Sequence, residues 1–470
     1  MMKNSLCALV ALLAMAQVNA QSVAAKLATA FETFENDQQL KSGIASIYVI
    51  DGGSGTVVFE KNAAIGLAPA STQKIITAAT AYELLGKDFR YETKFGYTGS
   101  LKEGKLDGGL YFKPSGDPTL GSWRWKTTTE TAVMKRFLAA FKATGIKTFG
   151  NSYFDERGWE SESVPDGWIW GDVGNYYGAG AGSLNWRENQ YDLVMKSGQT
   201  VNDAVVVVDT KPKLYNVYFD CRVTAAGKGT GDNSRIYLPV GGDVATVRGT
   251  IPVQEERFSV SGAMPSAPMQ FFSTLHDSLM RNGYAAQITT IHVDKSSKIT
   301  IPPAITFFHT EQSPSLDSMV YWFLKKSINL YGEALAKTLA LQKGKAASSE
   351  SGADLIRNYW KEKNIGIDAT ELNLQDGSGL SPQNRVTTHA QVVVLQYAQS
   401  QPWFDGYYRA FPEYNGMKLK SGTISDAKSF CGYHTSKEGK KFIVSFIVNN
   451  YNGASSSLVQ KMYKVLDVLK

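Results

Sequence analysis

The sequence predicts a mixed α/β domain built from the two ends of the chain, with β-rich domains inserted between them. Strand-like runs occur near both ends, over residues 44–50 and 441–449, and an amphipathic helix is expected at the C-terminus. The middle of the chain instead carries short β runs separated by glycine-rich turns. The chain has 470 residues, enough for about two to three domains.

The N-terminal part of this domain predicts helix, strand, strand, helix. The expected elements are a helix over residues 23–34, strands over residues 44–50 and 56–60, and a helix from Ser71 to about Leu85. The two strands are joined by a turn over residues 51–55 that contains three glycines. Gly86 is a typical helix stop. This order places Ser71 at the N-terminus of a helix.

The middle of the chain predicts one or two inserted β-rich domains. The expected elements are alternating strands over residues 89–121, a helix over 128–143, strands over 204–209, 217–224 and 236–240, and a helix over 273–282. Glycine-rich turns separate the short strands, and the sequence contains no internal repeat.

The C-terminal part returns to the mixed pattern. The expected elements are helices over residues 315–326 and 330–341, strands over 418–434 and 441–449, and a helix over 456–469. In the last helix, four apolar residues recur at spacings of four, three and four and form one apolar face: Leu458, Met462, Val465 and Leu469.

The first 20 residues have the pattern of a secretory signal peptide. Lys3 supplies a positive start, residues 6–16 are almost wholly apolar, and small residues at Val18 and Ala20 precede the expected cleavage after Ala20. The apolar stretch is too short to serve as a membrane anchor. We therefore expect an exported protein that acts in the periplasm or elsewhere outside the cytoplasm.

Composition excludes several function classes. The net charge of +6 is scattered, with no basic block and no nucleic-acid motif. The five histidines form no pair at metal-ligand spacing, so neither a metal nor another cofactor is expected. After removal of Cys7 with the signal peptide, Cys221 and Cys431 remain, and the sequence leaves open whether they pair. It also leaves the oligomeric state open.

Ser71-Thr72-Gln73-Lys74 is an S-x-x-K motif at the start of a predicted helix. Residues three apart share a helix face, so the Lys74 amine can reach the Ser71 hydroxyl and act as its base. The helix N-terminus also presents unpaired N–H groups that favour a developing oxyanion. A helix cap beside a solvated lysine would give the same four letters, so this motif alone is weak.

Two further motifs strengthen the interpretation. Ser327-Ile328-Asn329 lies between two predicted helices, and Lys420-Ser421-Gly422-Thr423 lies in the strand before the last apolar strand. S-x-x-K, S-x-N and K-[ST]-G-T in this order, each in its expected structural context, are the arrangement of penicillin-interacting serine enzymes.

Over most of its mature length the chain resembles the peptidase S13 family, the penicillin-binding protein 4 (DacB) type of D-alanyl-D-alanine carboxypeptidase and endopeptidase. The resemblance also covers residues 116–120, residues 168–189, Glu333 and residues 376–381. Ser327 follows Ser71 by 256 residues (327 − 71). This spacing fits the two domains that the family inserts between its first two motifs, and it is far longer than the corresponding spacing in a typical class A β-lactamase.

This resemblance implies a serine β-lactamase/DD-peptidase (transpeptidase-like) fold, with an antiparallel sheet and helices. The implied division is a signal peptide over 1–20, a catalytic domain over 21–87 and 299–470, one inserted domain over 88–198 and 268–298, and a second, β-rich one over 199–267. The implied partners are peptidoglycan peptides, through their D-Ala-D-Ala ends and their D-alanyl cross-links, and β-lactams as covalent inhibitors.

The resemblance also implies a role for each motif residue. Ser71 is the nucleophile, Lys74 its base, and Ser327 the group that passes the proton to the leaving amine. The backbone N–H groups of Ser71 and Thr423 form the oxyanion hole. Asn329 orients the substrate amide. The substrate carboxylate is held by a group of three: Lys420, Ser421 and Thr423.

Asp155 follows Phe154 at a predicted strand end, where the family places an acidic residue that faces the amine of the substrate side chain. It is therefore a candidate partner for a diaminopimelate-type ammonium. A solvated loop aspartate explains the same pattern equally well.

The chain departs from the family at two motif positions. Ile328 replaces the usual Asp of S-x-N, and Ser421 replaces the usual Thr of the third motif. Neither change removes a reacting group, but both affect the expected specificity. Two other functions stay open from the sequence: a non-catalytic wall-binding protein that keeps the fold, and a β-lactamase or related esterase. Covalent labelling and the deacylation rate would separate them.

Overall fold

The computed structural model describes residues 23–284, 289–302 and 304–470, so the predicted signal peptide lies outside the described residues. Two compact units divide this part of the chain. The first comprises residues 23–83, 320–327 and 354–470, and the second comprises the remainder. Among the described residues, no helix combines the length and the apolar character needed to cross a membrane.

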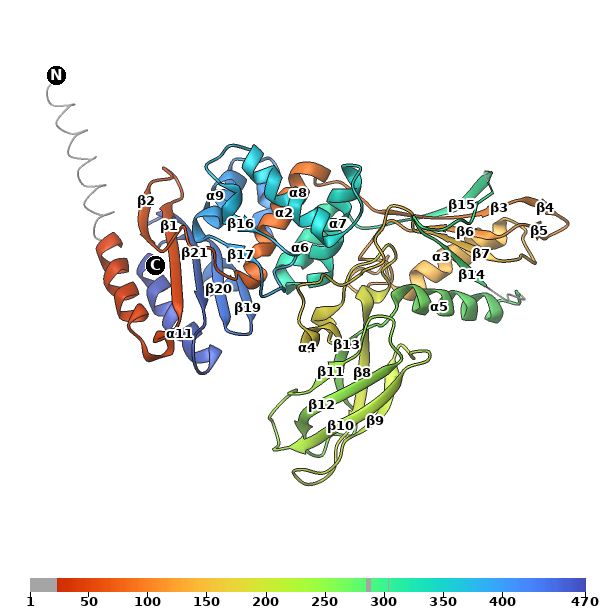
Figure 1. Cartoon of the computed structure of the whole chain (residues 1–470), viewed down its shortest axis with the longest axis horizontal. Helices are drawn as coiled ribbons and strands as arrows, with labels where there is room; N and C mark the ends of the chain where they lie inside the picture. The colour runs from red at the N-terminus through yellow and green to blue at the C-terminus, as the bar shows by residue number, and fades with distance from the viewer. Residues whose placement is uncertain (1–22, 285–288, 303) are drawn as a thin grey trace, which may run out of the picture. The chain divides into compact units, whose positions relative to one another are not determined.

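The first unit is built on a six-stranded antiparallel sheet in the order β18-β19-β20-β21-β1-β2 (Figure 1). Its strands are β1 (Ile44–Asp51), β2 (Val57–Lys61), β18 (Glu413–Tyr414), β19 (Met417–Ile424), β20 (Ala427–Thr435) and β21 (Lys441–Asn449). β1 pairs with β21 along its whole length, from Ile44 opposite Asn449 to Asp51 opposite Phe442. The prediction that the two ends of the chain form one domain is confirmed.

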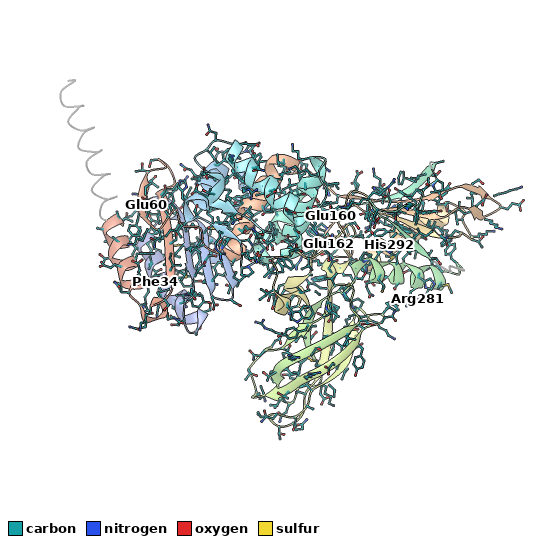
Figure 2. All side chains as sticks on the ribbon, viewed as in Figure 1. Phe34, Glu60, Glu160, Glu162, Arg281 and His292 are labelled. Carbon is teal, nitrogen blue, oxygen red and sulfur yellow. The ribbon has the colours of Figure 1, made fainter. Side chains whose placement is uncertain are left out.

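Helices cover one face of this sheet from both ends of the chain. Residues 23–35 are helical, α11 spans Ser455–Leu466, and Figure 1 shows the two helices on the same side of the sheet. Their apolar residues share a core with alternate residues of β1 and β21. Phe34, labelled in Figure 2, packs edge-on against Phe446 with ring centroids 5.2 Å apart. Each such buried side chain contributes about 1.5–3 kcal/mol.

The helix that follows Ser71 is α2 (Lys74–Leu85), which continues from the turn η2 (Ala70–Gln73). The unit also contains α6 (Leu316–Lys326), α8 (Ser349–Glu362), α9 (Thr388–Gln399) and α10 (Phe404–Arg409); α2, α6 and α8 each extend into the second unit. Burial would raise the pKa of Glu83 on α2, but hydrogen bonds from Lys363, Tyr359, Trp403 and Tyr397 lower it to about 2. This ionised carboxylate ties α2 to three other segments of the unit.

The second unit contains a five-stranded mixed sheet in the order β14-β7-β6-β3-β15. Its strands are β3 (Glu92–Thr98), β6 (Leu110–Lys113), β7 (Ser152–Asp155), β14 (Thr290–Val293) and β15 (Ile305–Gln312). Helices α3 (Glu130–Ala143) and α5 (Ala267–Arg281) pack their apolar faces on it, and aromatic rings dominate the shared core. A short hairpin, β4 (Ser100–Lys102) and β5 (Lys105–Asp107), lies between β3 and β6 in sequence.

Two three-stranded sheets form the remaining β-rich part of this unit. One has the order β13-β8-β9 and the other β10-β12-β11. Their strands are β8 (Gln190–Lys196), β9 (Val206–Lys211), β10 (Tyr218–Ala226), β11 (Arg235–Tyr237), β12 (Val244–Pro252) and β13 (Phe258–Ala263). Alternate side chains of both sheets share one core. The expected β-rich insertion is therefore present.

Several details differ from the sequence expectations. Residues 418–434, expected as one strand, form the β19–β20 hairpin, which turns at Asp426 with φ 57°. Helix α5 begins at Ala267 rather than at residue 273, because the Ser266 hydroxyl caps it. β15 pairs with β3, so the chain is still in the inserted sheet at residues 305–312, beyond the expected boundary at 299. β8 likewise joins the second β-rich part before the expected boundary at 199.

Candidate active site

The Ser71 hydroxyl and the Lys74 amine face each other at the start of α2. Lys74 Nζ donates a hydrogen bond to Ser71 Oγ over 2.9 Å. It also donates to the Ser378 carbonyl oxygen over 2.6 Å. Lys74 is fully buried, whereas Ser71 is only partly buried. The predicted S-x-x-K contact is therefore present, on a 3₁₀ turn that continues into the α-helix.

Close backbone packing holds this turn in place. Ala70 has a left-handed φ of 48°, which is costly for a residue with a Cβ and needs support from its neighbours. Gly379, with φ 81°, and Gly422 provide that support. A Cβ on Gly379 would collide with the Ala70 carbonyl oxygen, and one on Gly422 would lie 2.9 Å from the Ser71 nitrogen. Both glycines are needed for this approach.

The segment 376–381 carries the carbonyl that accepts from Lys74. The buried Asp376 carboxylate accepts from the Gly379 and Ser381 backbone N–H groups over 2.6 and 2.7 Å. It also accepts from Asn384 Nδ2 over 3.0 Å and from Gln73 Nε2 over 3.2 Å. The sequence marked this segment only through the family resemblance. Its contribution here is a backbone oxygen, which no side-chain motif can reveal.

A second serine–lysine contact joins the other two motifs. Lys420 Nζ donates to Ser327 Oγ over 2.9 Å and to the Ser421 carbonyl over 2.6 Å. Ser327 has a left-handed φ of 58°, a strained conformation of the kind that clusters at functional sites. Burial, and then the charge of Lys74, hold the pKa of Lys420 well below its usual range. Two lysines thus interact electrostatically inside one cluster of hydroxyl groups.

Strand β19 presents an open edge beside Ser71. Its neighbour β18 pairs only with Met417 and Lys418, so within the described chain no strand covers β19 beyond that point. Ser421 and Thr423 lie on this uncovered part. The Thr423 hydroxyl accepts from Lys428 Nζ over 2.6 Å. An uncovered strand edge can take up an extended peptide.

Asn329 belongs to the second compact unit, although it follows Ser327 by two residues. It begins α7 (Asn329–Gln342), and its Nδ2 donates to the Tyr177 carbonyl over 2.7 Å. Asn329, Glu333 and Lys337 are four residues apart and share one face of this helix.

Lys337 is a buried residue that the motif analysis did not identify. Its Nζ donates to the carbonyl oxygens of Glu162 and Ala181, each over 2.8 Å, and to that of Ser163 over 3.2 Å. Burial lowers its pKa to about 8. Lys337 and Asn329 thus both hold the segment 162–181 against α7. Its spacing of four residues from Glu333 could have placed it on the same helix face from the sequence alone.

Asp155 lies at the end of β7 in the second unit and is 1% exposed. Its carboxylate accepts two hydrogen bonds of 2.8 Å from Arg157 and one of 2.6 Å from the Tyr111 hydroxyl. Lys113 Nζ lies 3.2 Å away. Burial would raise the pKa of Asp155, but these partners outweigh burial and hold it well below its usual range. A substrate ammonium would have to displace one of the two cations.

Cys221 and Cys431 are both free thiols. Cys431 is buried on β20, opposite Lys420 on β19. Burial raises the pKa of the Cys431 thiol. The chain therefore gains no stability from a disulfide between these two residues in this structure.

The chain matches one protein family over most of its length. The profile of the "D-Ala-D-Ala carboxypeptidase 3 (S13) family" matches residues 27–413. A D-alanyl-D-alanine carboxypeptidase of Actinomadura sp. (strain R39) is 25% identical, over 90% of this chain and 81% of that protein. The D-alanyl-D-alanine carboxypeptidase DacB of Haemophilus influenzae is 22% identical, over 84% of this chain and 83% of that protein.

The fold is also similar to a solved structure. Penicillin-binding protein 4 (dacB) from Haemophilus influenzae superposes with a TM-score of 0.77. The match covers 93% of this chain and 98% of that one at 20% identity. The predicted fold class, with its inserted domains, is thereby confirmed.

Proposed function

Because the chain belongs to the D-Ala-D-Ala carboxypeptidase 3 (S13) family, we propose that it is a serine hydrolase that removes terminal D-alanine from peptidoglycan stem peptides. We include D-alanyl cross-links among its substrates. The 2.9 Å hydrogen bond between Lys74 Nζ and Ser71 Oγ carries this proposal, because it pairs a nucleophile with a base. A non-catalytic binding protein would have no need of that pair.

In the proposed acylation, Ser71 Oγ attacks the carbonyl carbon between the two D-alanines, and its proton passes to neutral Lys74. The neutral form of Lys74 is supported by the second lysine. When the substrate carboxylate binds beside Lys420, it favours the charged form of Lys420. Repulsion from that charge then favours loss of a proton from Lys74.

The tetrahedral oxyanion would be held by the backbone N–H groups of Ser71 and Thr423. The close approach of Gly422 to the Ser71 nitrogen supports this pairing of a helix start with the edge of β19. Loss of one such donor costs about 10²–10³ in rate. Lys420, with the hydroxyls of Ser421 and Thr423, would hold the substrate's terminal carboxylate.

Collapse of the tetrahedral intermediate breaks the C–N bond, and the departing D-alanine amine takes a proton. We propose that Ser327 passes this proton from Lys74, with support from its short contact to Lys420 in the same cluster. Asn329 would orient the substrate amide. Water then attacks the acyl-enzyme and gives one proton to Lys74, which passes it to Ser71 Oγ as the ester C–O bond breaks. The released carboxylic acid loses the other proton to solvent.

β-Lactams would acylate Ser71 by the same attack, because their strained amide opens without releasing a second fragment. The substrate also sets the compartment: peptidoglycan lies outside the cytoplasm, so we propose that the enzyme is exported, with residues 1–20 as the cleaved signal. Asp155 as a contact for the amine of the third stem residue stays a prediction, because its carboxylate already binds Arg157.

The test is the intact mass of the mature protein after incubation with benzylpenicillin, for the wild type and for Ser71→Ala. Ser54→Ala, which removes an exposed serine of the same unit, serves as the matched control. We expect a penicilloyl adduct on the wild type and on the control but not on Ser71→Ala. Release of D-alanine from a pentapeptide should follow the same pattern.

The other outcomes distinguish the alternatives. No adduct with penicillin left intact would support a non-catalytic wall-binding protein. No adduct with penicillin destroyed would mean fast deacylation, which is β-lactamase behaviour. An adduct that persists on Ser71→Ala would remove Ser71 as the nucleophile.

A further inference from the structure

The exposed face of the β10-β12-β11 sheet carries three arginines side by side. In the parallel pair, Arg222 of β10 lies opposite Arg248 of β12, and in the antiparallel pair Arg235 of β11 lies opposite the same Arg248. Paired residues of neighbouring strands point to the same face of a sheet. The three guanidinium groups therefore form a row across the full width of this sheet, here called the arginine row.

The arginine row is exposed, and in the described chain its central residue, Arg248, has no carboxylate partner. Arg222 pairs with Asp220 on its own strand, and Arg235 is attracted by Asp172 of α4 (Trp170–Val173). Within the part of the chain that the structure describes, Arg248 forms no ion pair. Like charges directly opposite on neighbouring strands destabilise a sheet, so two such pairs in one row carry a cost without a ligand.

Aromatic and apolar side chains continue this face. The Arg248 guanidinium lies over the Tyr237 ring, 5.6 Å from its centroid. The Trp170 ring also packs against Tyr237, with ring centroids 6.2 Å apart. Trp170 is 55% exposed, and Tyr218 of β10 is 69% exposed. A guanidinium held on an aromatic ring keeps its N–H edge available for a carboxylate.

We propose that the arginine row is a binding site for the carboxylates of polymeric peptidoglycan, separate from the catalytic residues. Guanidinium groups bind carboxylates with two parallel hydrogen bonds, and exposed aromatic rings suit the apolar faces of sugars. A polymer with a carboxylate on every free stem peptide can meet several arginines at once, which multiplies weak contacts. The inference rests on the proposed function for the identity of the polymer.

The test is co-sedimentation of the mature protein with insoluble peptidoglycan from which phosphate polymers have been stripped. The variant replaces the row: Arg222→Gln, Arg235→Gln and Arg248→Gln together. The matched control removes three exposed lysines of the same unit and the same total charge: Lys102→Gln, Lys105→Gln and Lys135→Gln. We expect apparent affinity to fall about tenfold in the row variant and to change little in the control.

Two further arms identify the ligand. Peptidoglycan whose carboxylates have been converted to amides should bind the wild type as weakly as it binds the row variant. Binding that appears only on unstripped walls would assign the row to a phosphate polymer and overturn the proposal. Equal binding by the row variant and the lysine control would also overturn it.

Catalysis provides the readout that separates this inference from the proposed function. Benzylpenicillin acylation and pentapeptide hydrolysis should be the same in the row variant and the wild type, while D-alanine release from insoluble walls should fall. If the wild type forms no adduct, the proposed function fails, whatever the sedimentation shows. If it forms the adduct but the row variant cleaves insoluble walls at the wild-type rate, only the arginine row is wrong.

Discussion

The buried lysines of the first unit and the exposed arginines of the second place cations close together for different purposes. Lys74 and Lys420 are 0% and 1% exposed, and each donates to a serine hydroxyl and to a backbone carbonyl. Burial, and then the charge of Lys74, disfavour the charged form of Lys420, so this cluster can keep one lysine neutral and able to act as a base. The arginine row faces water, keeps its charge, and is suited to attract an anion. Burial, more than residue type, separates proton transfer from electrostatic attraction.

The largest effect should come from removing the base. Lys74→Met keeps the length of the side chain and its burial but cannot accept the Ser71 proton. We expect the rate of benzylpenicillin acylation to fall about 10²–10⁴-fold, the usual contribution of a general base, with the fold retained. Stopped reactions followed by intact mass would measure it. Acylation near the wild-type rate would show that Lys74 is not the base and that the buried lysines do not serve proton transfer.

The next effect tests whether the buried cluster depends on close backbone packing. Gly422→Ala would place a Cβ 2.6 Å from the Pro69 carbonyl and 2.9 Å from the Ser71 nitrogen, so strand and turn must separate. We expect acylation to fall about 10²-fold, as for loss of one oxyanion donor. Gly227→Ala, at a glycine outside the left-handed region where a Cβ would meet nothing closer than 3.8 Å, controls for the loss of a glycine without a clash. Equal rates for the two variants would contradict this account.

Asp155 adds a buried carboxylate to the comparison. Asp155→Asn would leave Arg157 and Lys113 without their counter-ion, but both cations are partly exposed and can be rehydrated, so we expect a loss of about 1–3 kcal/mol of unfolding free energy. Urea denaturation would measure this loss. Unchanged stability, together with a raised KM only for peptides that carry the side-chain amine, would instead support a substrate contact.

Lys420→Met should raise stability, whereas Asp155→Asn should lower it. The folded state lowers the pKa of Lys420, so between that pKa and the unfolded value of about 10.4 the unfolded chain binds more protons. Wild-type stability should therefore rise with pH across this window, and the Met variant should lack that rise. At pH 7 we expect the variant to be more stable by about 1 kcal/mol, while acylation falls. Denaturation at several pH values tests the sign, and an identical pH dependence in both proteins would contradict it.

The smallest effect is expected in the arginine row. Arg248→Gln removes the central charge from between two like charges, so at low salt the unfolding free energy should rise by about 0.5 kcal/mol or less. At 1 M salt this gain should vanish, because exposed charges are then screened. Lys135→Gln is the control. A loss of stability that persists in high salt would show that Arg248 has a packing role.

The sequence predicted the contact between Ser71 and Lys74 better than the domain boundaries. Ser71, Lys74 and Lys420 could be identified because each lies in a short motif at the expected place on a helix or strand. The boundary at residue 299 missed β15, since the pairing of β15 with β3 joins residues more than 200 positions apart. The hairpin at Asp426 was missed because an aspartate can adopt the left-handed conformation without the glycine that usually signals a turn.

By itself the sequence determined the mixed fold built from the two chain ends and the kind of reaction, and it predicted the nucleophile with its base. Local spacing carries that information, because helices and strands repeat over a few residues. Only the tertiary structure decided which groups meet across long separations: the Ser378 carbonyl with Lys74, Ser327 with Lys420, and Arg248 between Arg222 and Arg235. Strand register and backbone packing set these contacts, and neither is written in the spacing of any single segment.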